Sequence, residues 1–363
     1  MNSTVIDLPA AWSTATGDST SSPVTEQRFE FSGDTYEYFR IWVVNLALSI
    51  GTLGVYSAWA KVRTQRYFYA NTRLAGATFD YQAQPLAILK GRAVALVLFG
   101  GYALAGQFSL KLQLGLAALI AVLAPWLVVR GAAFRARYSA WRGINFRFVP
   151  DYGEAYIRFL LIYLLLPLTM GLIFPFIKAK QKAFLVEHHR YGGKPFTFSA
   201  KPGDFYPSYL AAFAAMFLWA LVVTMSAGAF LFSPDATGGA KPSAALMYAM
   251  PLFFYAGYFA IFAFLAAAIA NLVYNSIQIA DNRLRSTLKG SQLLWIYSSN
   301  TLAILGSVGM LIPWAMIRLA RYRAECLTLL QAGDLDQFVA SAQSEVDATG
   351  SEMDGLFDID IGV

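Results

Sequence analysis

The sequence predicts an all-α polytopic membrane protein that is built from internal repeats. Three observations lead to this fold class, and the first is composition: of 363 residues, 57% are hydrophobic and 14% are charged, whereas soluble domains are about 25% charged. The second is a set of long apolar stretches, most of them close to the roughly 20 residues that a membrane-spanning helix needs. They cover residues 93–105, 114–129, 159–176, 209–232, 244–273 and 301–317.

The third observation is a motif that recurs without gaps. A large apolar anchor is followed by a basic residue four positions later, by glycine at seventeen, and by aromatic residues at twenty and twenty-two. The clear copies are anchored at Trp59, Trp126 and Phe176, a weaker one at Val273 and a truncated one at Trp314. Shared offsets in three copies indicate a true repeat. We therefore expect a membrane domain of about five repeats over residues 28–330.

Each clear copy ends in an alternating pattern of aromatic residues, and Phe29-Glu-Phe31 has the same form ahead of the first apolar segment. Alternation of this kind is typical of a strand. We expect short Phe-x-Phe strands at the repeat junctions of an otherwise helical protein.

Two tails are expected to flank this domain. Residues 1–27 are rich in Ser and Thr, show no cleavable signal peptide and are expected to be disordered. Residues 331–363 hold eight acidic residues and no basic one, which is typical of a solubilising tail. The alternative is a lid on a basic face, because residues 1–330 carry a net charge of +14, from 28 basic and 14 acidic residues. The apolar residues of the tail that could pack against that face are Leu356, Phe357, Ile359 and Ile361.

The distribution of basic residues favours one topology. Residues 84–135 and 208–275 each contain two spans, whereas the segments near residues 48, 168 and 306 either cross once or return to their own side. If they return, all 28 Lys and Arg residues except Lys111 and Lys241 share one face. The positive-inside rule therefore favours four full spans plus three re-entrant or broken helical hairpins. Seven single spans are the alternative.

Glycines mark the expected helix breaks, since glycine adopts conformations that end a helix. One lies five residues before the anchor in each of the three segments, and a second pair matches between the first and third segments. The candidate break residues are Gly51, Gly54, Gly171, Gly306 and Gly309.

Asparagines occur in the same segments. Asn45 and Asn300 each lie fourteen residues before an anchor, and polar groups at membrane depth are costly unless they are paired. One interpretation is hydrogen bonding between helices that holds the fold. The other is a midplane polar site between broken helices, whose ends offer free backbone groups and dipoles to a solute. Asn271 is a weaker candidate for that site.

Basic residues interleaved with aromatic ones follow the anchors. This pattern is typical of helices that run along the cytoplasmic surface among anionic headgroups, so we expect membrane lipids as partners and no nucleic acid. The sharper alternative is a docking surface for an anionic solute or a protein. The expected basic surface comprises Lys61, Arg63, Arg66, Arg130, Arg135, Arg137, Lys180, Arg318 and Arg321.

Nothing in the sequence nominates an enzyme, a cofactor or a metal site. The only histidines, His188 and His189, are adjacent, and adjacent helix residues do not point to one centre. The single Cys326 excludes an intramolecular disulfide. No Ser-His-Asp arrangement, phosphate-binding loop or dinucleotide fingerprint is visible.

Several longer stretches resemble one family. The segment FSGDTYEYFRIWVVNLALSIGTLGVYSAWAKVRTQRYFYANTRLAGATFDY, together with NLVYNSIQIADNRLRSTL and PWAMIRLARYRAE, is similar to the YjgN-type family of bacterial inner-membrane proteins, a family of unknown function. The resemblance extends from about Phe29 to Leu330. It implies a multi-pass protein of the bacterial inner membrane, and it supplies no activity and no functional residues.

Two function classes follow. The repeats, the broken helices and the Asn45/Asn300 pair favour a transporter or channel-like protein for a small anionic or amphipathic solute. The lack of charge within the membrane segments favours a membrane scaffold or lipid-organising protein that transports nothing. We expect the first, with both termini in the cytoplasm.

Overall fold

The structure is a computed structural model that describes residues 24–231 and 244–353. Its centre is a closed barrel of ten antiparallel strands in the order β1-β10-β9-β8-β7-β6-β5-β4-β3-β2. The expectation of an all-α fold is therefore wrong. Short strands do stand at the junctions, but a lone strand leaves its backbone N–H and C=O groups unpaired. Joining all ten into one ring satisfies these groups and removes every exposed edge.

The ten strands are short. They are β1 (Thr25–Phe31), β2 (Thr72–Leu74), β3 (Ala77–Tyr81), β4 (Ser139–Trp141), β5 (Ile144–Phe148), β6 (His189–Tyr191), β7 (Lys194–Phe198), β8 (Ile277–Ile279), β9 (Asn282–Ser286) and β10 (Leu327–Gln331).

The helices make up most of the described chain. They are α1 (Thr35–Gly51), α2 (Ser57–Ala70), α3 (Pro85–Phe108), α4 (Leu110–Arg137), α5 (Tyr152–Phe159), the 3-10 helix η2 (Leu161–Leu164), α6 (Leu165–Leu168), α7 (Phe174–Glu187), α8 (Pro202–Leu231), α10 (Ala244–Asn275), α11 (Gly290–Gly306), α12 (Ile312–Glu325) and α13 (Leu335–Met353).

A helix, a strand, a tight turn and a second strand follow one another four times, and α12 then leads into β10. The first strand of every unit begins thirteen residues after an aromatic residue of its helix: Thr72 after Trp59, Ser139 after Trp126, His189 after Phe176, Ile277 after Phe264 and Leu327 after Trp314. The expected fourth anchor, Val273, is thus out of register. Gly290, seventeen residues after Val273, begins α11 and does not lie in a hairpin turn as Gly76 and Gly143 do.

In the copies anchored at Trp59 and Trp126, the glycine seventeen residues after the anchor has a clear backbone role. Ala75 and Gly76 have φ values of 48° and 76°, and Arg142 and Gly143 have 48° and 78°. Two successive residues with positive φ make the type I′ turn that suits the twist of a hairpin. The second position favours glycine, because a side chain strains this conformation.

Aromatic side chains fill the barrel. The first aromatic residue of each alternating pattern lies opposite another large apolar residue, as in the pairs Phe79–Trp141 and Phe146–Tyr191. Neighbouring rings in this layer have centroids 5.2 to 6.3 Å apart. The barrel core is therefore a packed ring of aromatic residues rather than an open pore.

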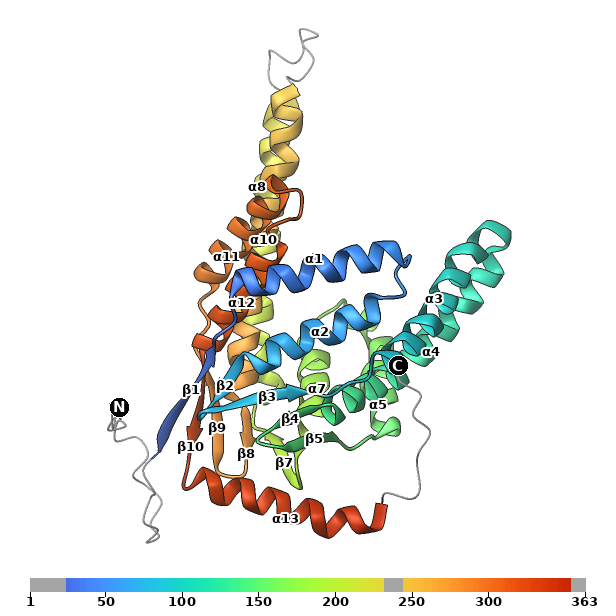
Figure 1. Cartoon of the computed structure of the whole chain (residues 1–363). Coiled ribbons are helices and arrows are strands. Elements are labelled where there is room, and N and C mark those ends of the chain that lie inside the picture. The colour runs from blue at the N-terminus through green and yellow to red at the C-terminus, as the bar shows by residue number, and fades with distance from the viewer. Residues whose placement is uncertain (1–23, 232–243, 354–363) are drawn as a thin grey trace.

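Within the described residues, four helices are long and apolar enough to cross a membrane, judged by length and composition: Pro85–Phe108, Leu110–Arg137, Pro202–Ser226 and Phe253–Asn275. They form two hairpins, α3–α4 and α8–α10, which project from the same side of the barrel, while α13 lies across the opposite side (Figure 1). Their outward faces expose large apolar side chains, with Leu96 75% and Val97 73% exposed. Lipid contact is the setting in which such exposure is stable.

Both expected tails include ordered elements. Strand β1 begins at Thr25, inside the range 1–27, and α13 occupies residues 335–353 of the acidic segment. Residues 1–23 lie outside the described part of the chain, as do Lys241 and the four apolar residues Leu356, Phe357, Ile359 and Ile361.

Candidate functional site

Three short helical hairpins, α1–α2, α6–α7 and α11–α12, share one turn geometry. In each turn a residue with φ near 50° precedes a glycine with φ between 84° and 92°: Leu53–Gly54, Met170–Gly171 and Val308–Gly309. The glycine N–H donates to a carbonyl five residues earlier, on Ser49 (2.7 Å), Leu166 (2.9 Å) and Ile304 (2.8 Å). This is a Schellman-type helix end. Helices α1 and α11 end at Gly51 and Gly306, just before these turns.

The tips of the three hairpins are apolar and exposed. Leu53, Met170 and Val308 are 96%, 94% and 92% exposed. A large apolar side chain held at the apex of a turn loses contact with water only if the apex enters a lipid layer or a partner.

At three of the five anchors, the basic residue four positions later lies over the anchor's ring. The guanidinium of Arg130 is 5.6 Å from the ring centroid of Trp126, the ammonium of Lys180 is 5.6 Å from Phe176, and Arg318 is 5.1 Å from Trp314. A cation over an aromatic face is stabilised by the ring quadrupole. At these three anchors the offset of four residues is therefore an intrahelical cation–π pair, and the three cations are half-buried.

The structure separates the three candidate asparagines. Asn300 is buried; its Nδ2 donates to the carbonyl of Ala315 (3.2 Å) and its Oδ1 accepts from Nη1 of Arg318 (3.1 Å). Asn45 is also buried, yet neither polar atom of its side chain has a partner among the described residues. Asn271 lies near the barrel end of α10 and bonds to the backbone of Leu288. Asn300 and Asn271 thus hold local structure, and Asn45 is the unsatisfied one.

The basic residues gather on α2, α4, α7 and α12, the helices that lead into the strands. Some brace the near rim of the barrel: Arg66 donates to the carbonyl of Tyr81 (3.2 Å), and Arg321 donates to that of Gly33 (3.2 Å). The exposed members of the expected basic surface are Lys61, Arg63, Arg66, Arg135, Arg137 and Arg321.

A cavity of about 490 Å³ lies between the aromatic layer of the barrel and the last turns of α2 and α4. Its lining combines aromatic rings with a few polar groups, which is the usual make-up of a small-molecule site. The lining residues are Phe29, Phe68, Tyr69, Thr72, Phe79, Arg135, Ala136, Ser139, Phe146 and His189.

The polar lining groups of this cavity are held in place. The hydroxyl of Ser139 donates to the carbonyl of Arg135 (2.7 Å) and lies 3.1 Å from the hydroxyl of Tyr69. Burial lowers the pKa of His189, and the charges of Arg135 and His188 lower it further. A neutral imidazole beside an exposed guanidinium leaves one positive charge, that of Arg135, at the rim of an apolar cavity.

Sequence reasoning missed this cavity, although a signal for it was present. Equivalent offsets from the anchors supply the lining: nine residues for Phe68 and Arg135, ten for Tyr69 and Ala136, thirteen for Thr72, Ser139 and His189, and twenty for Phe79 and Phe146. Only the barrel brings these equivalent positions round one space.

Asp151, Glu154 and His188 form a second polar cluster, with potential ligand atoms within 4.8 Å of one another. Protein contacts already engage each of them. Glu154 pairs with Arg158 and, at 3.4 Å, with His188. Asp151 caps α5 by accepting the N–H of Glu154 (2.8 Å). These contacts explain the cluster as local structure.

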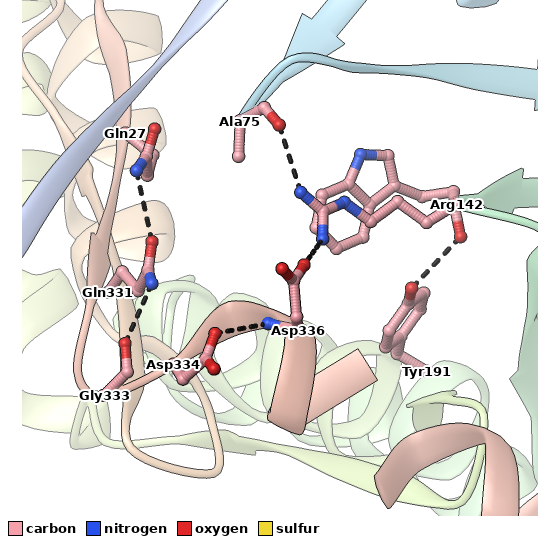
Figure 2. A network of polar contacts seen from close by, with 9 residues as sticks. Gln27, Ala75, Arg142, Tyr191, Gln331, Gly333, Asp334 and Asp336 are labelled. Atoms are coloured by element: carbon pink, nitrogen blue, oxygen red, sulfur yellow. Dashed lines mark hydrogen bonds and ion pairs between the residues drawn. The ribbon is translucent and has the colours of Figure 1, made fainter. Parts of the chain in front are cut away.

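The far end of the barrel is covered by α13. Its residues Leu335 and Ala342 are buried in the same cluster as Trp141 and Tyr191, and Phe338 packs against that cluster. Polar contacts surround this apolar centre (Figure 2). They are the Arg142–Asp336 ion pair, Arg142 to the carbonyl of Ala75 (3.1 Å), Tyr191 to that of Trp141 (3.0 Å), Gln27 to Gln331 (3.2 Å), Gln331 to Gly333 (2.8 Å), and the N–H of Asp336 to Asp334 (2.9 Å).

Comparison with known proteins points to the same setting as the apolar helices, a membrane. A family model described as "Bacterial protein of unknown function (DUF898)" matches residues 26–356. The chain is 23% identical over 356 residues to "Inner membrane protein YjgN" of Salmonella typhimurium, covering 84% of this chain and 88% of the relative. The protein of the same name from Escherichia coli strain K12 is 32% identical over 164 residues, covering 43% and 39%. No solved structure matches. The chain is an integral membrane protein.

Proposed function

The chain belongs to the DUF898 family of bacterial proteins of unknown function, as its resemblance to YjgN-type proteins indicated, and from this premise we propose that it is a transporter or channel-like protein for a small amphipathic anion. The observation that carries the proposal is the barrel cavity, about 490 Å³ in volume and lined by aromatic rings with Arg135 at its rim. Such a site suits a solute with an apolar body and one anionic group.

The barrel is placed on the cytoplasmic side in this proposal. Both ends of the described chain lie at the barrel, in β1 and α13. The basic residues gather where the helices meet the barrel, whereas Lys111 lies in the first turn of α4, at the far end of the α3–α4 hairpin. The positive-inside rule then puts the barrel and both termini in the cytoplasm of the inner membrane. The two long hairpins cross the bilayer, and the exposed tips at Leu53, Met170 and Val308 enter it from the barrel side.

Asn45 provides a second line of support. It is buried on α1, in the first of the three short hairpins, and its amide has no partner within the described residues. An unpaired amide in an apolar setting costs a few kcal/mol. Contact with water or solute in a hydrated path would remove that cost. We further propose that the five helix–strand units are copies of one repeat, so that the path lies between equivalent helices.

Uptake into proteoliposomes tests the proposal. Naphthalene-1-sulfonate is a suitable probe, because it is fluorescent, amphipathic and permanently anionic. Vesicles containing the full chain are expected to accumulate it faster than protein-free vesicles. Arg135→Gln removes one charged hydrogen-bond donor, worth about 1.5–3 kcal/mol, so the uptake rate is expected to fall about tenfold or more.

Arg137→Gln is the matched control. Arg137 is exposed at the end of the same helix but does not line the cavity, so uptake is expected to stay at the wild-type rate. If wild-type vesicles take up the probe no faster than protein-free vesicles, the proposal that the protein transports this class of anion is overturned. Equal losses in the two variants would overturn the role of the cavity.

The second candidate is a membrane scaffold or lipid-organising protein, and the three exposed apolar tips favour it. It predicts no uptake of the probe by wild-type vesicles, together with loss of co-purifying lipid when Leu53, Met170 and Val308 are all replaced by Ser. Transport predicts uptake that depends on Arg135, whatever the tips bind.

A further inference from the structure

A separate cleft of about 230 Å³ lies between α1, α11 and α12, away from the barrel cavity. Its lining includes Arg318, Arg321 and Glu325, together with Gln292 of α11 and Trp314 at the start of α12. The cleft thus presents two cations and one anion in a small volume.

Arg318 is positioned in advance for a ligand. Its Nη1 donates to the hydroxyl of Ser299 (2.6 Å) and to Oδ1 of Asn300 (3.1 Å), and its guanidinium lies over Trp314. Both hydrogen bonds leave from one nitrogen, so Nε and Nη2 have no hydrogen-bond partner among residues 24–231 and 244–353. A planar guanidinium held in this way presents two parallel donors, which suits a phosphate.

Arg321 and Glu325 are one helical turn apart but do not pair with each other. Arg321 donates from Nη2 to the carbonyl of Gly33 (3.2 Å). Glu325 is exposed, and no ion pair joins it to any described residue. A spacing of four residues commonly supports an ion pair on a helix. Because no such pair forms here, the Glu325 carboxylate remains available to a ligand.

The order of these groups along α12 is informative. From the hairpin tip towards the barrel, the helix presents the Trp314 ring, then Arg318 and Arg321, then Glu325. A phospholipid with an ethanolamine headgroup has the same order: acyl chains, a phosphate anion and a terminal ammonium. Four helical residues rise by ~6 Å, a length that an oxygen and an ethylene unit between phosphorus and nitrogen span with the help of flexible side chains.

We propose that this cleft binds a zwitterionic aminophospholipid, with its phosphate on Arg318 and Arg321 and its ammonium on Glu325. The proposal rests on the membrane placement of the α11–α12 hairpin and is independent of transport. An ammonium on Glu325 distinguishes this lipid from an anionic one, which offers no cation to the carboxylate.

Native mass spectrometry of the full chain in detergent tests the proposal, with phosphatidylethanolamine and phosphatidylglycerol added separately. The wild type is expected to bind the ethanolamine lipid about tenfold more tightly, the ratio that one net charged contact supplies. Glu325→Gln is expected to erase this preference while retaining both lipids. Arg321→Gln is expected to weaken both about equally. Arg323→Gln is the control, because Arg323 is exposed on the same helix outside the cleft.

Two outcomes would overturn the proposal. One is that the wild type binds the two lipids with equal affinity and that Glu325→Gln changes neither affinity. The other is displacement of bound lipid by free phosphoethanolamine at equal concentration, which would identify a soluble phosphate ester as the occupant. Glu325 is exposed, and its side chain has no hydrogen bond or ion pair with the described residues, so the fold is expected to tolerate Glu325→Gln. Uptake of the naphthalene sulfonate is expected to be unaffected in Glu325→Gln, so failure of either proposal is visible without the other.

Discussion

Arg142, in the turn between β4 and β5, forms an ion pair with Asp336 in the first turn of α13, although 194 positions separate the two residues in sequence. The pair fastens the C-terminal helix to the far end of the barrel. The Asp336 side chain is 83% exposed, and exposed ion pairs contribute only about 0–1 kcal/mol. Docking of α13 therefore depends chiefly on its apolar face, where the rings of Phe338 and Tyr191 stack with centroids 5.8 Å apart.

The first prediction compares these two contributions. Phe338→Ala is expected to loosen α13 by about 2–4 kcal/mol, because it removes a partly buried ring from the barrel core. Asp336→Asn is expected to cost less than about 1 kcal/mol. Hydrogen exchange of residues 335–344 measures both. The control is Asp281→Asn, an exposed carboxylate at the turn between β8 and β9. A larger effect for Asp336→Asn than for Phe338→Ala would show that charge rather than packing holds the helix.

The second prediction concerns the tips of the short hairpins. Gly54→Ala, Gly171→Ala and Gly309→Ala are each expected to destabilise the protein by about 1 kcal/mol, because these residues have positive φ and a Cβ strains that conformation. Gly51→Ala and Gly306→Ala are the controls. They lie in helices with no atom within 4 Å of an added Cβ, so the change is expected to be neutral or slightly stabilising. Thermal unfolding in detergent measures the difference, and equal shifts in both sets would contradict the turn geometry.

The third prediction separates the two buried asparagines of the short hairpins, Asn45 and Asn300. Asn300→Leu is expected to lower stability by about 1–3 kcal/mol, because it removes the hydrogen bonds from Asn300 to the carbonyl of Ala315 and from Arg318 to Asn300. Asn45→Leu is expected to cost less than Asn300→Leu, because no described protein group loses a hydrogen bond and only the proposed contact with water or solute is removed. The measurement is the melting temperature of the purified protein. A comparable loss in Asn45→Leu would reveal a water or solute contact at Asn45 and would strengthen the transport proposal.

The fourth prediction is a dependence of stability on pH. The pKa of His189 is lowered from its ordinary value of 6.5, first by burial and then by the charges of Arg135 and His188. As pH falls below 6.5, the unfolded state takes up a proton before the folded state does, so stability is lost down to the folded pKa and is intact above 6.5. When the pH is lowered from 7.5 to 5, the melting temperature of the wild type is therefore expected to fall relative to that of His189→Gln. Arg135 and His188 are present in both proteins, so the comparison isolates His189, and a constant difference would contradict it.

Local features of the fold could be predicted from the sequence. The apolar stretches, the alternating aromatic residues and the glycines at hairpin turns act over a few residues each, through burial, side-chain alternation and backbone freedom. The offset of four residues between an anchor and the following basic residue also reflects local structure, because residues four apart lie on the same face of a helix. The fourth anchor was misplaced because Val273 satisfied some offsets by coincidence, whereas Phe264 has the correct spacing to its strand.

The barrel, the cavity and the docking of α13 were decided by the tertiary structure alone. Strand β1 pairs with β10, with Thr25 opposite Gln331, and no local pattern states that partner. The sequence of a short strand does not specify whether the strand pairs only within its own hairpin or also with a neighbouring hairpin. The closed ring is favoured because it pairs the backbone groups of every strand edge and buries one layer of aromatic side chains. By itself, the sequence determined that this is a membrane protein with short strands between its apolar segments. Their closure, a property of all ten strands together, decided which equivalent residues face a common space.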